Sequence, residues 1–189
     1  FYKMKKKEIT TVFTIYFIFF LIGISFYKDF GLSVDEWELR LLGFANLKYV
    51  TEIFFPNNLS NFDEILITSK TWDHYGTHGA IFALPMAFIE YFFDITDSQK
   101  YYFIRHYFNH LIFLISNFYF FLLVRERFNN WTYGILGALF LFLSPRIFAE
   151  SFYNQKDILF LSLFTINLYY GVHFLKSPTF KNSILFSLT

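Results

Sequence analysis

The longest uninterrupted apolar segment constrains this chain most. Residues 9–27 (ITTVFTIYFIFFLIGISFY) contain no charged side chain, and an α-helix needs about 20 apolar residues to cross the hydrocarbon core of a bilayer. Lysines precede the segment, as they do in a signal peptide. The apolar part is longer than the core of a usual signal peptide, however, and no small-residue cleavage site follows it. We therefore expect an uncleaved membrane anchor.

The overall composition agrees with a membrane protein. Of the 189 residues, 55% are hydrophobic and 25% are aromatic, and the mean hydropathy is +0.38. The chain contains no Cys, which excludes disulfides and thiolate metal sites. The formal net charge is only +1, and we expect no nucleic acid partner.

Further apolar segments predict an all-α membrane protein with a multi-span transmembrane helix bundle. After residues 9–27 we expect spans at about 102–124, 131–143 and 158–175, and the start of a fifth span at 182–189. This last segment is too short to cross a bilayer. We therefore expect the chain to be the N-terminal part of a longer protein.

A long mixed region, residues 28–100, separates the first two spans. Apolar residues recur at helical spacing within 34–55, which predicts an amphipathic helix. Residues 80–93 are apolar over only 14 positions and include Pro85, so we expect a helix at the membrane interface rather than a span. The region is predicted to be a long outer loop that carries interfacial, juxtamembrane helices.

The distribution of charge predicts the topology. With the N-terminus in the cytoplasm, the inner segments hold eight basic residues and two acidic ones, which satisfies the positive-inside rule. The loop 28–100 and the turn before Asp157 then face outward. Because the composition is rich in Phe, Ile, Lys and Asn, we expect a bacterial inner membrane protein whose outer side faces the periplasm.

Carboxylates occur at two places on this outer side. Asp35 and Glu36 follow the first span closely, and Asp157 stands at the start of the fourth. A carboxylate at the edge of hydrocarbon needs a nearby cation or metal, and Arg146 and Lys156 are candidates for that cation. The simpler alternative is that both aspartates stabilise helix N-termini.

The combination of these features resembles the C-type membrane glycosyltransferases, in the group of protein O-mannosyltransferases and lipid A aminoarabinose transferases. The stretch 143–170 (LSPRIFAESFYNQKDILFLSLFTINLYY) carries most of the resemblance. In this group one acid lies in the first outer loop and a second at the start of the fourth span, which here are Asp35 with Glu36 and Asp157. The motif YGTHG, from Tyr75 to Gly79, stands where the group has a loop before a juxtamembrane helix.

The resemblance implies transfer of a sugar from a polyprenyl-phosphate donor to the hydroxyl of a protein, lipid or glycan acceptor, with inversion at the anomeric carbon. Asp35 would act as the general base, which accepts the proton of the acceptor. The leaving phosphate needs cations, and Arg105, Arg146 and Lys156 would supply them. Tyr75, His78 and His106 are further candidates for substrate binding. For Arg105, the alternative is a side chain that reaches out to the membrane interface.

The histidines raise a second site hypothesis. His74 and His78, and separately His106 and His110, are four residues apart, a spacing that places both rings on one face of a helix and could hold a divalent metal ion. Asp73 could complete the first site. Polar lining of a cavity or hydrogen-bonded packing is the alternative for both pairs.

Two other classes of function remain open. A multi-span transporter or lipid flippase would also bury charges in its spans, but it should show similarly broken spans in two halves. A non-catalytic membrane subunit should tolerate Asn at Asp35 and Asp157. The long outer loop with interfacial helices favours catalysis at the membrane surface.

Overall fold

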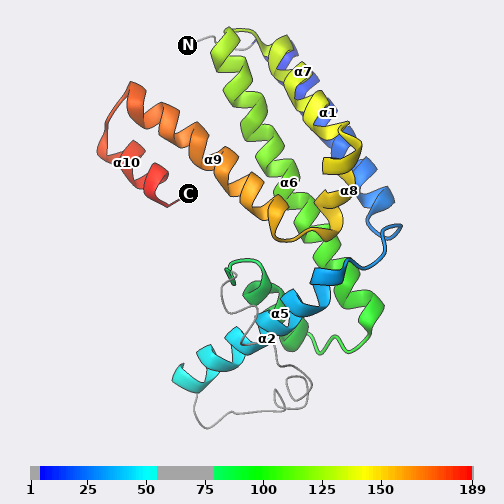
Figure 1. Cartoon of the computed structure of the whole chain (residues 1–189). Helices are drawn as coiled ribbons and strands as arrows, with labels where there is room; N and C mark the ends of the chain where they lie inside the picture. The colour runs from blue at the N-terminus through cyan, green and yellow to red at the C-terminus, as the bar shows by residue number, and fades with distance from the viewer. Residues whose placement is uncertain (1–4, 55–78, 189) are drawn as a thin grey trace. The chain divides into compact units, whose positions relative to one another are not determined.

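The computed structural model describes residues 5–54 and 79–188, and every regular element in these ranges is a helix (Figure 1). The predicted all-α membrane fold is therefore confirmed. The chain divides into two compact units. Unit 1 comprises Phe1–Phe30 and His106–Thr189, and unit 2 comprises Gly31–Arg105.

Three helices are long and apolar enough to cross a membrane. They are α1 (Lys6–Phe26), α6 (Ser98–Phe128) and α9 (Asp157–Lys176). They occupy the places of the first, second and fourth predicted spans and have the length and composition that a span requires. At 1.5 Å per residue, the 31 residues of α6 extend over about 46 Å, well beyond the hydrocarbon core.

The third predicted span, residues 131–143, is not one straight helix long enough to cross alone, and a crossing at this place stays a prediction. The segment forms α7 (Trp131–Phe142), whose 12 residues cover only about 18 Å. The chain then bends by 67° into α8 (Pro145–Tyr153), so the two helices form a broken span or a re-entrant loop. Pro145 explains the break. A proline has no backbone N–H to donate to the carbonyl of the preceding turn, and it favours the first turn of a new helix.

Helix α10 (Phe180–Ser187) occupies the place of the expected fifth span. It is eight residues long and lies beside α9 (Figure 1). Asn167 on α9 donates a hydrogen bond of 3.1 Å to the carbonyl of Phe186, and Phe174 stacks on the Phe186 ring. The helix is thus confirmed, whereas a further crossing stays a prediction.

Unit 1 is held together where α1, α6 and α7 pack closely. Phe19 of α1 stacks on Phe142 of α7 at 4.0 Å between ring centroids, and Phe113 of α6 is fully buried in the same cluster. Gly134 lies against Phe121, so the backbones of α7 and α6 approach closely. Small residues allow such approaches between helices in lipid, where no hydrophobic force pulls the helices together.

Polar side chains add specific contacts to this packing. The Tyr16 hydroxyl bonds to the side-chain oxygen of Asn117 at 2.8 Å, and Asn117 Nδ2 donates to the carbonyl of Ala138 at 3.0 Å. One chain of hydrogen bonds therefore links α1, α6 and α7. The polar groups in this chain are buried or partly buried. Because hydrocarbon contains no water to bond them, they are satisfied by hydrogen bonds to one another.

Unit 2 contains α2 (Val34–Phe54), α5 (Ala83–Phe92) and the first two turns of α6. The two helices expected in the loop 28–100 are confirmed, whereas their place at the membrane interface stays a prediction. Gly43 of α2 touches the Ala83 carbonyl and Ala87 of α5, and a Cβ on Gly43 would collide there. Pro85 fits in α5 because it lies in the first turn, where backbone N–H groups have no helical partner.

Candidate functional site

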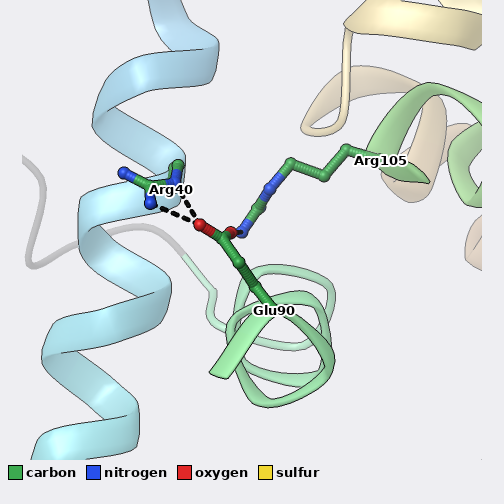
Figure 2. Close-up of polar contacts among 3 residues, drawn as sticks. All are labelled: Arg40, Glu90 and Arg105. Atoms are coloured by element: carbon green, nitrogen blue, oxygen red, sulfur yellow. Dashed lines mark hydrogen bonds and ion pairs between the residues drawn. The ribbon is translucent and has the colours of Figure 1, made fainter. Parts of the chain in front are cut away.

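A buried cluster of charges forms the centre of unit 2. Glu90, on α5, accepts hydrogen bonds from two guanidinium groups (Figure 2). Arg40 of α2 contacts Oε1, with Nε at 2.7 Å and Nη2 also bonded. Arg105 of α6 contacts Oε2 with Nη2 at 3.2 Å. The three side chains come from three helices, so the cluster ties these helices together.

Aromatic rings enclose this cluster. The guanidinium carbon of Arg40 lies 3.9 Å from the ring centroid of Tyr101 and 5.0 Å from that of Phe44. Cations are attracted to ring faces, more strongly where water is excluded. Tyr102 is buried within electrostatic range of both arginines and of Glu36. Glu90, the one acid in the apolar helix α5, is therefore the centre of a buried ion-pair cluster.

Arg105 is the least exposed of these charged groups, at 1%. Its Nε and Nη1 have no hydrogen-bond partner among the residues that the structure describes. Buried polar groups without a partner are uncommon, since each lost bond costs about 1–3 kcal/mol. Arg105 is buried against Glu90, and its contact with a donor phosphate stays a prediction that requires the cluster to open.

The two acids that open α2 have different environments. Asp35 is exposed in the first turn, whereas Glu36 is fully buried. Glu36 Oε2 accepts the backbone N–H of Ser33 at 2.9 Å, as a Glu in this position of a helix N-terminus often does. Glu36 thus has a structural task, while the carboxylate of Asp35 is accessible to an acceptor hydroxyl.

The second acidic position lies in unit 1, at the turn from α8 to α9. Asp157 is the first residue of α9 and is exposed. Asn154 Nδ2 donates to its Oδ2 at 3.0 Å, and its own N–H donates to Asn154 Oδ1 at 3.0 Å. Asp157 therefore stabilises the helix N-terminus, as the simpler alternative holds, and still leaves carboxylate surface open.

Cations surround the same turn. Arg146, on α8, is exposed over 86% of its side chain and bonds through Nε to Glu150 at 2.8 Å. The negative charge of Asp157 also acts on Arg146. Lys156 is exposed directly before α9. Arg146, Lys156 and Asp157 are thus all exposed, whereas the contact of either cation with Asp157 stays a prediction.

The histidines of α6 are buried and engage separate partners. His106 Nδ1 lies 3.3 Å from the Tyr27 carbonyl. His110 Nδ1 lies 2.8 Å from Ser151 Oγ, and because that hydroxyl donates to the Phe148 carbonyl, His110 must be the donor to Ser151. Within residues 5–54 and 79–188, no group of three or more His, Asp or Glu side chains is arranged to hold a metal ion. In the structure, each of the two imidazole rings is packed in the interior and hydrogen-bonded to its own partner.

Several predicted positions stay outside these observations. Tyr75 and His78, and the metal hypothesis for His74 with His78 and Asp73, lie outside the described residues. Asp35 belongs to unit 2 and Asp157 to unit 1, and a single site that contains both acids is a prediction from the family resemblance.

Sequence reasoning missed Arg40 and Glu90. One signal for Glu90 was present, because a lone carboxylate in the apolar helix ALPMAFIEYF must find a cation or lie at a polar surface. The partners were not predictable, since Arg40 lies 50 residues away in the sequence.

Comparisons with known proteins found no match for this chain among family models, curated proteins or solved structures.

Proposed function

We propose that this chain belongs to a membrane glycosyltransferase that moves a sugar from a polyprenyl-phosphate donor to an acceptor hydroxyl. The observation that supports the proposal most is the exposure of Arg146 on α8 and of Lys156 and Asp157 at the start of α9. Guanidinium and ammonium groups at a membrane surface suit the phosphate of a lipid carrier.

Asp35 serves as the general base in this proposal. Its carboxylate accepts the proton of the acceptor hydroxyl while that oxygen bonds to the anomeric carbon from the side opposite the phosphate. The bond from the anomeric carbon to the phosphate oxygen breaks, and polyprenyl phosphate leaves with the electron pair. Asp35 suits this task better than Glu36, because Glu36 is buried and bonded to the Ser33 N–H.

Arg146 and Lys156 stabilise the charge that develops on the leaving phosphate. Glu150 holds the Arg146 guanidinium through Nε at 2.8 Å, and two bonds to Asn154 fix the position of Asp157. The proposed donor, acceptor and periplasmic site come from the family resemblance, and the described surface supplies residues of the required chemistry.

The experiment measures sugar transfer from radiolabelled undecaprenyl-phosphate hexoses and aminopentoses by the purified protein in lipid vesicles. Asp35→Asn should lower turnover about 100-fold or more, as expected for a lost general base. Asp29→Asn, which alters an exposed acid before α2, is the matched control and should keep full activity. Equal turnover for wild type and Asp35→Asn would refute this role of Asp35.

One observation favours a second function, a lipid transporter or flippase. The bend of 67° between α7 and α8 is the kind of interruption that transporters place at substrate sites. Vesicles that move labelled undecaprenyl phosphate between leaflets, without sugar transfer and with no effect of Asp35→Asn, would replace the glycosyltransferase proposal with this one.

A further inference from the structure

An open apolar groove runs between α1 and α6 in unit 1. Its volume is about 830 Å³. Val12, Leu114 and Phe121 form a buried floor, while Phe13 and Ile115 are more than half exposed along its sides. The remaining lining residues are Ile9, Tyr16, Phe20, Leu111, Phe118, Leu122 and Arg125.

The groove differs from the surfaces where helices of unit 1 touch. Those contacts use glycine: Gly23 lies against His110, Gly134 against Phe121 and Gly137 against Val124. The groove lining contains no Gly, Ala, Ser or Thr. Helix contacts in a bilayer are enriched in such small residues, because they let two backbones approach closely. A lining of bulky aliphatic and aromatic side chains suits a flexible hydrocarbon chain better than another helix.

The two helices are antiparallel, and their contacts define the register. Tyr16 bonds to Asn117, and Gly23 touches His110, so each step forward on α1 matches a step back on α6. Ile9 is therefore level with Val124, the residue next to Arg125. The exposed Lys6 and Lys7 lie within one turn before Ile9, so one end of the groove is basic.

Arg125 lies at this basic end and belongs to the lining. Its guanidinium covers the Phe121 ring at 5.9 Å, and its Nη2 lies 3.6 Å from Glu126 Oε1. Glu126 is also shared with Lys176 of α9, at 3.4 Å from Nζ, so the charge of this acid is compensated from a second side. Asp157 stands at the other end of α9.

We propose that this groove binds one acyl chain of an anionic phospholipid, whose phosphate meets Arg125. On α6 the lining extends from Leu111 to Arg125, about 21 Å at 1.5 Å per residue. One leaflet accounts for about half of the 30 Å hydrocarbon core, so the groove is long enough for a complete acyl chain. This lipid is separate from the proposed sugar donor, because its headgroup lies at the opposite end of unit 1 from Asp157.

The test is native mass spectrometry of the purified full chain with phosphatidylglycerol or phosphatidylcholine of identical acyl chains. The wild-type chain should bind phosphatidylglycerol about fivefold more tightly, the usual effect of one basic residue near an anionic headgroup. Arg125→Gln should remove this preference. Ile115→Trp should displace either lipid, because it fills the groove from a half-exposed position without entering the core.

Two matched controls separate the groove from the rest of the surface. Arg127→Gln removes an exposed charge two residues from Arg125, and Phe140→Trp enlarges a side chain of α7 that is 77% exposed. Both should bind lipid as the wild type does. Equal affinity for the two lipids, or retention of lipid by Ile115→Trp, would overturn the proposal. A dimer of the chain that Ile115→Trp dissociates would show that a second copy occupies the groove instead.

Discussion

At the scale of single residues, Glu90 connects more charged groups than any other acid described in unit 2. Glu90→Gln should lower the free energy of unfolding by about 3 kcal/mol or more, because two buried guanidiniums would lose their counter-charge. Denaturation of the purified protein by increasing fractions of SDS measures the change.

Glu52→Gln is the control for this substitution. Glu52 forms an exposed pair with Lys48 one turn away, and such pairs contribute well under about 1 kcal/mol. A Glu90→Gln protein as stable as Glu52→Gln would mean that the buried cluster is not a source of stability.

Gly23 offers a second residue-scale prediction. A Cβ there would collide with the His110 ring, so Gly23→Ala should destabilise the contact of α1 with α6 by about 1–3 kcal/mol. His110→Ala opens space, and the double variant should be less destabilised than the sum of the two single variants. Gly31→Ala, at a position with nothing within 4 Å, serves as the control. Additive effects would show that the two residues do not interact.

The sequence anticipated the chemistry of single residues better than their partners. Arg105 was expected to be a cation that meets an anion, and the anion that it meets is Glu90. That partner could not be specified in advance, because an ion pair between separate helices depends on how the helices pack. Asp157 was easier, since its partner Asn154 is local and follows from the ordinary chemistry of helix N-termini.

At the scale of helices, hydropathy located the apolar segments and misjudged one of them. Residues 131–143 are apolar enough for a span, yet α7 ends at Phe142 because Ser144 and Pro145 start a new helix. The sequence shows the proline but not the 67° bend, across which the Phe148 ring of α8 packs edge-on against Phe142 of α7. The positions of the helical segments were thus predictable from the sequence, whereas the angle between consecutive helices was not.

The contact between α6 and α9 provides a prediction at this scale. Glu126 on α6 meets His173 Nε2 at 3.1 Å and Lys176 Nζ at 3.4 Å, both near the end of α9. Glu126→Gln should broaden the distribution of distances between spin labels at Arg127 and Ser177, measured by pulsed electron paramagnetic resonance. Glu150→Gln, which alters a pair within α8, should leave that distribution unchanged. An unaltered width in Glu126→Gln would show that this acid does not hold α9.

At the scale of the whole molecule, the orientation in the bilayer is the prediction to test first. We expect α6 to cross the membrane because it is long and apolar enough, so its two ends should react from opposite sides. A single cysteine at the exposed Gln99 should react with an impermeant maleimide in intact spheroplasts, and one at Asn129 only after lysis. The absence of native Cys keeps the background low. The reverse pattern would place the proposed base, Asp35, in the cytoplasm.

The antiparallel register of α1 and α6 also fixes the number of residues between their contacts. Tyr16 and Gly23 are seven residues apart, as are Asn117 and His110, and seven residues make nearly two complete helical turns. Adding one residue between Tyr16 and Gly23 would rotate one contact about 100° away from its partner. An insertion or deletion inside these helices therefore separates one of the two contacts. We expect changes of chain length in this bundle to be tolerated only in its turns.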